Sequence, residues 1–297
     1  MRSQKLILST SIGSSQAACD PVFLGQVIKL AEAAYIDLLL LGETSSMAAP
    51  PPFDPLVIAG WLAPRTRRVG LVPLVPALHA EPYHVARALS ALDFLTGGRS
   101  GWQPSTATRS DGGSVATPIL SAEQSLMKAR DFLAATRSLW SSWDSDALIV
   151  DQASGVYLNP DKVRRNNYRG PFFQVLGPLN AARPPQGEPI LVQNAVDPMS
   201  QQSLADVLLV DLDGPQSETA KLRVAKVALE QVHALGIERI ETLFHSGSID
   251  GIHLAMLNPL AGLTTFLTDD LPTLRRRGLV QTDATCLPLR TRFGLTR

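Results

Sequence analysis

The stretch Glu81–Trp102, EPYHVARALSALDFLTGGRSGW, decides the fold that the sequence predicts. Apolar residues recur at helical spacing from Val85 to Leu95, and Gly97-Gly98 ends the helix. The preceding run Arg67–Val75, RRVGLVPLV, is rich in Val and Leu and is typical of a strand that is buried on both faces. A further strand begins just after the two glycines. Strand, helix and strand form one βαβ unit, whose crossover is right-handed in a parallel sheet.

The same alternation of strands and helices extends to both sides of this unit. The pattern predicts strands at Lys5–Ile12, Ile36–Leu41, Pro189–Gln193 and Asp206–Asp211, and helices at Gln26–Ala34, Leu56–Ala63 and from an N-cap at Ser121 onward. Turn residues recur between short apolar pieces from Asp144 to Arg183, which indicates an excursion with a β-hairpin. The sequence therefore predicts an α/β chain that folds as a TIM-type (β/α) barrel with an insertion around residues 144–183.

The second half of the chain departs from this regular pattern. We expect a long helix at Glu218–Leu235, then strands at Glu238–Phe244 and Gly251–Met256. Only residues 245–250 separate the last two, whereas adjacent parallel strands need a crossover of about a dozen residues. The barrel is therefore expected to be shortened or irregular in its second half.

Length and charge narrow the class of protein. The 297 residues suit one barrel domain spanning residues 1–297, and 45% hydrophobic content is ample for its core. A formal net charge of zero argues against nucleic acid or an anionic membrane as a partner. No apolar run approaches the roughly 20 residues of a membrane helix, so we expect a cytoplasmic protein. Cys19 and Cys286 lack metal-ligand neighbours at a useful spacing, and no metal is expected.

Two segments of the chain resemble the bacterial luciferase-like flavin monooxygenases. The branch they resemble includes nitrilotriacetate, dibenzothiophene-sulfone and long-chain alkane monooxygenases. The first segment matches the family pattern NEPYHLARxxAxLDxLSGGRxGWN at Glu81, Pro82, Tyr83, His84, Ala86, Arg87, Leu92, Asp93, Gly97, Gly98, Arg99, Gly101 and Trp102. The second matches a family pattern in the insertion and the strand after it, at Gly155, Pro160, Lys162, Gly170, Phe173, Gly177, Pro178, Leu179, Asn180, Arg183, Gln186, Gly187 and Gln193.

The resemblance implies an activity and its partners. Reduced FMN would arrive from a separate flavin reductase, capture oxygen as a C4a-peroxide, and oxidise a small organic substrate in a pocket shielded from water. The resemblance also implies a homodimer. Two other functions stay open at this point: a non-catalytic or weakly flavin-binding relative that acts as a binding or partner protein, and a deazaflavin-dependent oxidoreductase.

The family's flavin positions correspond to four residues that we expect to line the pocket: Glu43, Gln103, Thr106 and Asn194. The Ser/Thr-rich segment from Pro104 to Ile119 is expected to lie over the active site, because loops at the carboxyl ends of barrel strands do so. No catalytic residue is assigned. His79, in the loop after the strand that ends at Val75, is the candidate acid or base.

Other positions depart from the family pattern. The hydroxyl-rich end of the third strand corresponds to residues 73–78, PLVPAL, which carry no hydroxyl group. The phosphate loop corresponds to Asn194–Asp197, where a carboxylate replaces a pair of serines. At about 4 Å and an effective dielectric near 20, the repulsion between this carboxylate and a phosphate charge is on the order of 4 kcal/mol. The sequence thus predicts weak affinity for FMN.

The remaining histidines are expected neither to act in catalysis nor to bind a metal. His84 and Arg87 are expected to join Asp93 in a structural polar network rather than in catalysis. His245 and His253 do not have a spacing that supports a metal site with Asp250.

Overall fold

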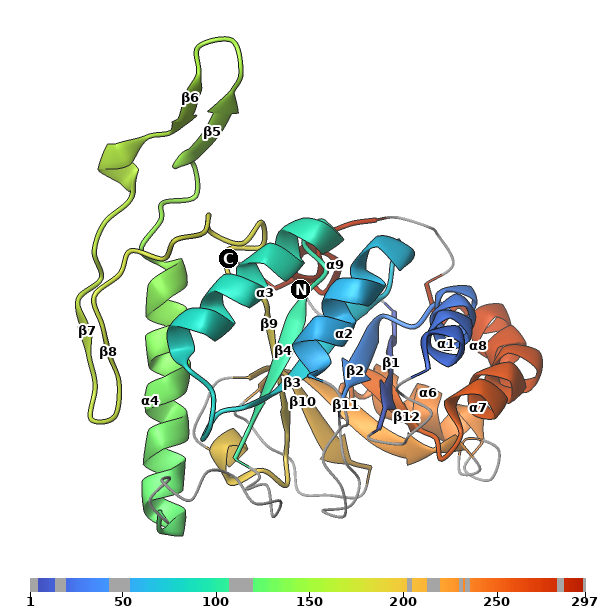
Figure 1. Ribbon diagram of the computed structural model, residues 1–297. Helices are drawn as coiled ribbons and strands as arrows, with labels where there is room; N and C mark the ends of the chain where they lie inside the picture. The colour runs from blue at the N-terminus through green and yellow to red at the C-terminus, as the bar shows by residue number, and fades with distance from the viewer. Residues whose placement is uncertain are drawn as a thin grey trace.

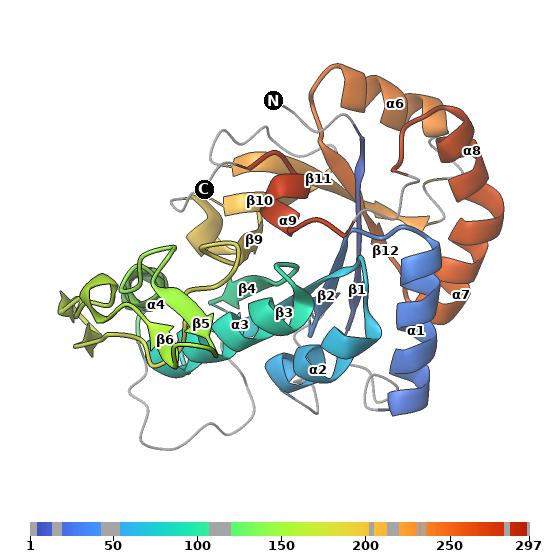
Figure 2. The ribbon, with the colours of Figure 1, turned by 90° about the horizontal axis from the view of Figure 1, so that it is seen from above.

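A closed barrel of parallel strands organises the chain (Figures 1 and 2). The computed structural model describes residues 5–13, 20–42, 54–106, 120–201, 205–212, 220–229, 232, 236–281 and 286–295. Within these residues the strand order around the barrel is β1-β12-β11-β10-β9-β4-β3-β2. The strands are β1 (Ile7–Ile12), β2 (Leu38–Leu41), β3 (Gly70–Pro76), β4 (Gly101–Ser105), β9 (Ile190–Asn194), β10 (Ala205–Asp211), β11 (Ala220–Ala228) and β12 (Gly251–Ala255). The predicted TIM-type barrel is confirmed.

Helices cover the outside of the barrel, and most of them begin at residues that favour a helix start. They are α1 (Pro21–Ala33), α2 (Pro55–Leu62), α3 (Pro82–Thr96), α4 (Ala122–Trp140), α6 (Ile237–His245), α7 (Pro259–Thr265) and α8 (Leu271–Arg276). Short 3-10 helices occupy Ala63–Arg65, Pro160–Lys162 and Pro198–Gln201, and a π-helix occupies Phe266–Asp270. The predicted N-cap Ser121 forms a full capping box with Gln124. Among the described residues, every helix is too short or too polar to cross a lipid bilayer.

The unit predicted from Glu81–Trp102 is present, but its polar network differs from the expected one. Asp93 is fully buried and accepts hydrogen bonds from Ser100 and from Gln186. His84 and Arg87 are exposed and do not join Asp93, which corrects the expected network. They lie on the outer side of α3, whereas Asp93 lies on the side that packs against the barrel.

The irregular second half is confirmed, although two of its elements were predicted wrongly. The segment expected as a helix at 218–235 contains strand β11, and the strand expected at 238–244 is helix α6. The closed barrel requires a strand between β10 and β12, and β11 pairs with both of them. Its apolar side chains suit this place, because Val224 and Val227 are buried on opposite faces of the strand. Helix α6 then supplies the crossover to β12 that the sequence prediction lacked. The shortening lies earlier, since only residues 212–219 separate the parallel strands β10 and β11.

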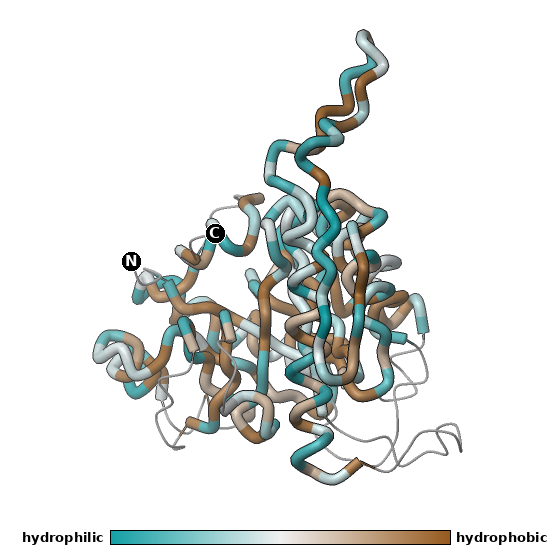
Figure 3. Tube along the Cα trace, turned by 90° about the vertical axis from the view of Figure 1, so that its left-hand side faces the viewer, coloured by the Kyte–Doolittle hydropathy of each residue, from teal (hydrophilic) through white to brown (hydrophobic). Residues whose placement is uncertain are grey.

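The insertion predicted around 144–183 forms an arm that projects from the barrel (Figures 1 and 3). It carries two antiparallel hairpins, β5 (Leu148–Asp151) with β6 (Val156–Leu158) and β7 (Tyr168–Arg169) with β8 (Gln174–Val175). Asp131 of α4 clasps the second hairpin, because its carboxylate accepts the backbone N–H groups of Phe172 and Phe173 at 2.7 and 2.8 Å and the Tyr168 hydroxyl. The predicted excursion is confirmed.

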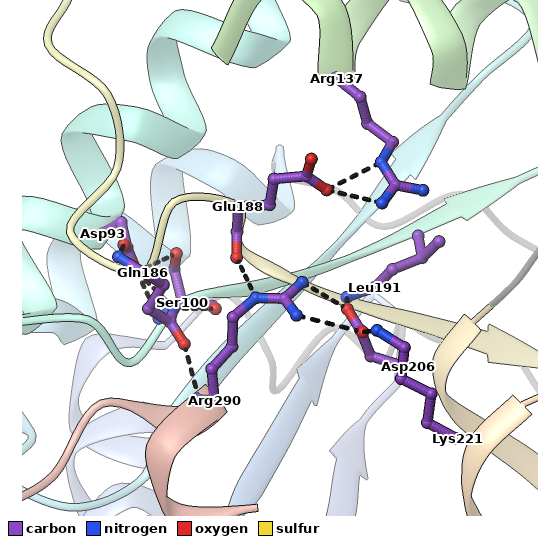
Figure 4. Close-up of polar contacts among 9 residues, drawn as sticks. All are labelled: Asp93, Ser100, Arg137, Gln186, Glu188, Leu191, Asp206, Lys221 and Arg290. Atoms are coloured by element: carbon purple, nitrogen blue, oxygen red, sulfur yellow. Dashed lines mark hydrogen bonds and ion pairs between the residues drawn. The ribbon is translucent and has the colours of Figure 1, made fainter. Parts of the chain in front are cut away.

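A short C-terminal helix, α9 (Leu289–Arg292), closes the end of the barrel where the strands begin (Figure 2). Leu289 and Phe293 pack into the inner core with apolar side chains of the strands. Arg290 forms a buried ion pair with Asp206 at 2.7 Å and donates to the backbone carbonyl of Glu188, as Figure 4 shows. Side chains of α9 therefore fill this end of the barrel and form hydrogen bonds there.

Barrel closure between β1 and β12 leads to a prediction at Gly251. A methyl group at this position would lie 2.3 Å from the carbonyl oxygen of Ile7, which is backbone of the neighbouring strand. We expect Gly251→Ala to lower the free energy of unfolding by about 3 kcal/mol, the upper end of the range for overpacking. Chemical denaturation measures the effect.

Gly25 in α1 is the matched control, since a methyl group there meets nothing within 4 Å. Gly25→Ala is expected to stabilise the protein by up to about 1 kcal/mol, because alanine favours a helix. Equal stability of the two variants would contradict the close approach of β1 and β12.

Candidate active site at the barrel mouth

The inner surface of the barrel changes from apolar to polar toward the carboxyl ends of the strands. Apolar side chains fill the inside up to this level, from Ile7, Leu38, Leu40, Val72, Ile190, Val192, Val207, Leu209, Leu222 and Val224. Strand residues alternate between the two faces, so the next inward positions include Leu74, Asp211 and five further polar residues, Ser9, Gln103, Asn194, Lys226 and His253. We call these five residues the mouth layer. Active sites of this fold lie at this end of the strands.

His253 is the most enclosed member of the mouth layer. Its side chain is 2% exposed, and its Nδ1 lies 3.0 Å from the Ser9 hydroxyl on the neighbouring strand. Burial, and secondarily the nearby Lys226 ammonium group, lower the pKa of His253 to about 4. The imidazole is therefore neutral at physiological pH and serves as a hydrogen-bonding group rather than as a source of protons.

Lys226 provides a positive charge at the edge of the same layer. Its ammonium group lies 2.9 Å from Asp211 and 3.3 Å from the side-chain oxygen of Asn194. The Asp211 side chain is 65% exposed, whereas that of Lys226 is only 23% exposed. The carboxylate is thus largely hydrated and neutralises the lysine only in part, so the mouth keeps a partly buried cation.

Gln103 carries one of several buried polar atoms that have no hydrogen-bond partner among the described residues. Its side chain is 5% exposed, and its carbonyl oxygen is buried without a hydrogen-bond partner among the described residues. Such an atom costs about 1–3 kcal/mol of stability. Gly101, two residues earlier in β4, faces Val72 of the inner core, so Gln103 points the same way, into the barrel. The carbonyl oxygen of Gln103 therefore faces the barrel interior without a hydrogen-bond donor from the described residues.

Thr106 and Asp197 form a contact just beyond the mouth layer. The Asp197 carboxylate accepts hydrogen bonds from the backbone N–H of Thr106 at 3.0 Å and from its hydroxyl at 2.8 Å. It also accepts the N–H of Met199 at 2.9 Å. We call these contacts the Asp197 clasp. They join the end of β4 to the loop after β9.

Three of the four residues predicted to hold a cofactor lie at this end of the barrel. Gln103 and Asn194 belong to the mouth layer and Thr106 to the Asp197 clasp, while Glu43 lies outside the described residues, as do positions 107–119 of the predicted covering loop. His79 is exposed in the turn after β3, so the structure does not bring it into the mouth layer. Whether these residues act on a cofactor or a substrate stays a prediction.

The sequence prediction missed Ser9 and Lys226 and assigned no role to His253. Lys226 was overlooked because its segment was expected to be a helix, where it would face outward at no particular site. The alternation of Leu222, Val224 and Lys226 is the signal that could have identified it, because a period of two places all three on one face of a strand.

A cleft on the outside of the barrel is separate from the mouth layer. It is lined by Glu81, Tyr83 and Lys128 and by the arm segment 172–178. No member of the mouth layer contributes to it.

The pKa of His253 leads to a prediction about stability. Because the folded-state pKa lies near 4 and the ordinary value is 6.5, the unfolded chain binds a proton first as the pH falls. The contribution of the neutral imidazole is fully present above pH ~6.5 and is lost as the pH falls toward 4, by about 3 kcal/mol in all. We expect His253→Gln to reduce the loss of stability over this window, as measured by denaturation at a series of pH values.

His79→Gln is the control for this experiment, since it replaces an exposed imidazole. This variant should show the same pH dependence of stability as the wild-type protein. If His253→Gln and the wild-type protein lost stability in parallel between pH 6.5 and 4, the imidazole of His253 would not be buried as described.

Comparison with known proteins agrees with this architecture. The sequence profile of the luciferase-like monooxygenases matches residues 5–229. N-acetyl-S-(2-succino)cysteine monooxygenase of Bacillus subtilis (strain 168) is 31% identical over 193 residues, which cover 60% of this chain and 42% of that protein. Dibenzothiophene-sulfone monooxygenase of Rhodococcus erythropolis is 36% identical over 154 residues, which cover 50% of this chain and 33% of that protein. The chain thus spans less than half the length of both relatives.

Solved structures show the same fold. EDTA monooxygenase from Chelativorans sp. BNC1 superposes with a TM-score of 0.80 at 19% identity, covering 99% of each chain. A long-chain alkane monooxygenase superposes with a TM-score of 0.81 at 18% identity over 99% of this chain and 96% of that one. The profile match over most of the chain confirms the family predicted from the sequence: the chain belongs to the luciferase-like monooxygenases.

Proposed function

We propose that this chain binds a reduced flavin at the barrel mouth and uses it to oxygenate a small organic molecule. A separate flavin reductase would supply the reduced flavin. Family membership supports the reaction class. The observation that carries the proposal is the buried carbonyl oxygen of Gln103, which faces the barrel interior without a partner among the described residues. A protein keeps such an atom at a cost in stability, which a ligand that donates a hydrogen bond would offset.

The mouth layer fits the ring end of a flavin. The pyrimidine edge of the ring presents both N–H donors and carbonyl acceptors, which the amides of Gln103 and Asn194 complement. Lys226 lies beside Asn194, and a cation there favours the anionic form of a reduced flavin. The bound flavin would supply the reaction with oxygen. The chain would orient the ring, exclude water with its apolar inner core, and present His253 as a neutral hydrogen-bonding group.

The phosphate end of FMN, the form that the family resemblance implies, fits the described residues poorly. Thr106, the hydroxyl residue predicted for the cofactor, already donates both its N–H and its hydroxyl to Asp197. A phosphate at the Asp197 clasp would meet a carboxylate instead of free donors. The proposal therefore concerns the flavin ring and assigns no phosphate contact.

Substrate class follows only from the relatives. Two of them are named for organosulfur compounds, a cysteine thioether and a dibenzothiophene sulfone. We therefore propose a small organic substrate and take these two compounds as the first to assay. That the protein forms a homodimer stays a prediction of the family resemblance.

The test is a titration of the purified protein with riboflavin and with FMN, oxidised and reduced, followed by calorimetry. We expect Gln103→Leu to weaken binding of each flavin that binds by about tenfold, the effect of one buried hydrogen bond. The variant should be as stable as the wild-type protein or more stable, because it removes a buried oxygen without a partner. Weaker binding together with unchanged or higher stability separates a ligand contact from a structural one.

Gln26→Leu, an exposed position in α1, is the control and should leave flavin binding unchanged. Oxygenation is then assayed with a flavin reductase and isotopically labelled oxygen. If no flavin bound up to about 1 mM, which corresponds to only ~4 kcal/mol, the proposal would be wrong. The non-catalytic binding or partner protein would then be the better interpretation, and the occupied Asp197 clasp is the observation that favours it.

A further inference from the structure

The Asp197 clasp has the composition of an anion site that is already occupied. Its donors are the N–H and hydroxyl of Thr106, with the N–H of Met199 as a third. Backbone N–H groups and hydroxyls that converge on one point suit a phosphate as well as a carboxylate. Here the anion belongs to the chain itself, and it reaches across from the loop after β9 to the end of β4.

The clasp lies directly beyond the residues that would hold a flavin ring. Gln103 and Asn194 lie on the neighbouring strands β4 and β9. Thr106 follows Gln103 by three positions, and Asp197 follows Asn194 by three positions. Asn194 to Asp197 is a turn closed by a hydrogen bond from the Asp197 N–H to the Asn194 carbonyl oxygen. Gln103 to Thr106 runs outward along the end of β4, and three residues of extended chain span roughly 10 Å. That distance is comparable to the length of a ribityl arm with its terminal phosphate. A flavin phosphate that extended outward along β4 would therefore meet the clasp.

In the described part of the chain, the charge at the clasp is not balanced by a basic side chain. Among the described residues, no lysine, arginine or histidine forms an ion pair with Asp197. A phosphate dianion would have to displace the carboxylate from its donors and then remain beside it, and both effects oppose binding. A ribityl arm that ends in a neutral hydroxyl would meet neither obstacle, because it can hydrogen-bond to the carboxylate.

We infer that Asp197 is a specificity-determining residue that makes the barrel mouth take a flavin without a phosphate, riboflavin, in preference to FMN. The inference rests on the proposed flavin-binding function and adds to it the form of the flavin. In this chain the donors that would hold a phosphate instead connect β4 to the loop after β9.

The experiment compares the affinities for riboflavin and FMN in the wild-type protein and in two variants, Asp197→Ser and Asp197→Asn. The wild-type protein is expected to bind riboflavin at least about tenfold more tightly than FMN. Asp197→Ser removes the charge and frees the donors, so its affinity for FMN should rise at least about tenfold while that for riboflavin changes little. Asp197→Asn keeps an acceptor at the clasp but removes the charge. Its ratio of riboflavin affinity to FMN affinity should lie between those of the wild-type protein and Asp197→Ser.

Asp161→Ser is the matched control, because it removes an exposed carboxylate in the arm. It should leave the ratio of the two affinities unchanged. Asp197→Asn also controls for a loss of folding in Asp197→Ser, because the asparagine oxygen can still accept the hydrogen bonds that join β4 to the loop. If both Asp197 variants retained the wild-type ratio of affinities, the inference would be overturned and the proposed flavin binding would stand.

Inorganic phosphate separates this inference from the proposed function. We expect phosphate to raise the melting temperature of Asp197→Ser but not that of the wild-type protein, because only the variant has free donors. If no protein bound flavin but phosphate still stabilised Asp197→Ser selectively, flavin binding would be refuted while the occupied anion site would be supported. Absence of phosphate stabilisation in both Asp197 variants would count against the clasp as an anion site.

Discussion

Buried carboxylates at the start of the strands hold the barrel together. Asp206 accepts the backbone N–H of Leu191 on the neighbouring strand and pairs with Arg290 of α9 (Figure 4). Asp37 does the same with the N–H of Leu8 and with Arg68. Each carboxylate therefore joins two strands and also neutralises a buried arginine. Removing one partner of such a pair leaves an uncompensated charge in the core, at a cost of about 3–5 kcal/mol.

Polar groups serve different purposes at the two ends of the barrel. At the end closed by α9, Asp93, Gln186 and Ser100 are linked by hydrogen bonds. The side-chain oxygen of Gln186 also accepts the backbone N–H of Arg290, which connects this network to α9. At the mouth, the carbonyl oxygen of Gln103 is buried without a partner among the described residues. A linked network stabilises one conformation, whereas an unlinked buried atom costs stability unless a ligand binds it. Arg68 and Arg292 at the closed end also carry buried nitrogens without a hydrogen-bond partner among the described residues. The proposed site therefore depends on the whole polar mouth layer, including the partly buried Lys226 and the neutral His253.

Residues 218–256 show where sequence reasoning reached its limit. The segment around β11 contains Val224, Ala225 and Val227 close to Leu222, and such a short apolar run suits a helix or a fully buried strand equally well. Helix α6 has Ile237, Ile240 and Leu243 at helical spacing, but it is only nine residues long. Local preference cannot settle either case. The closed barrel decides both assignments, because every strand in it needs a partner on each side. The segment between β10 and β12 therefore forms strand β11, and the segment after it forms helix α6.

The sequence by itself determined the barrel class, the unit from Glu81 to Trp102, the arm and the positions of Gln103, Thr106 and Asn194 at strand ends. These features depend on local periodicity and on residue patterns that are contiguous in the chain. Tertiary structure alone decided that Ser9, Lys226 and His253 meet Gln103 and Asn194 in one layer, and that Asp197 binds Thr106. Such contacts join residues up to 244 positions apart, and only the closure of the barrel brings them together.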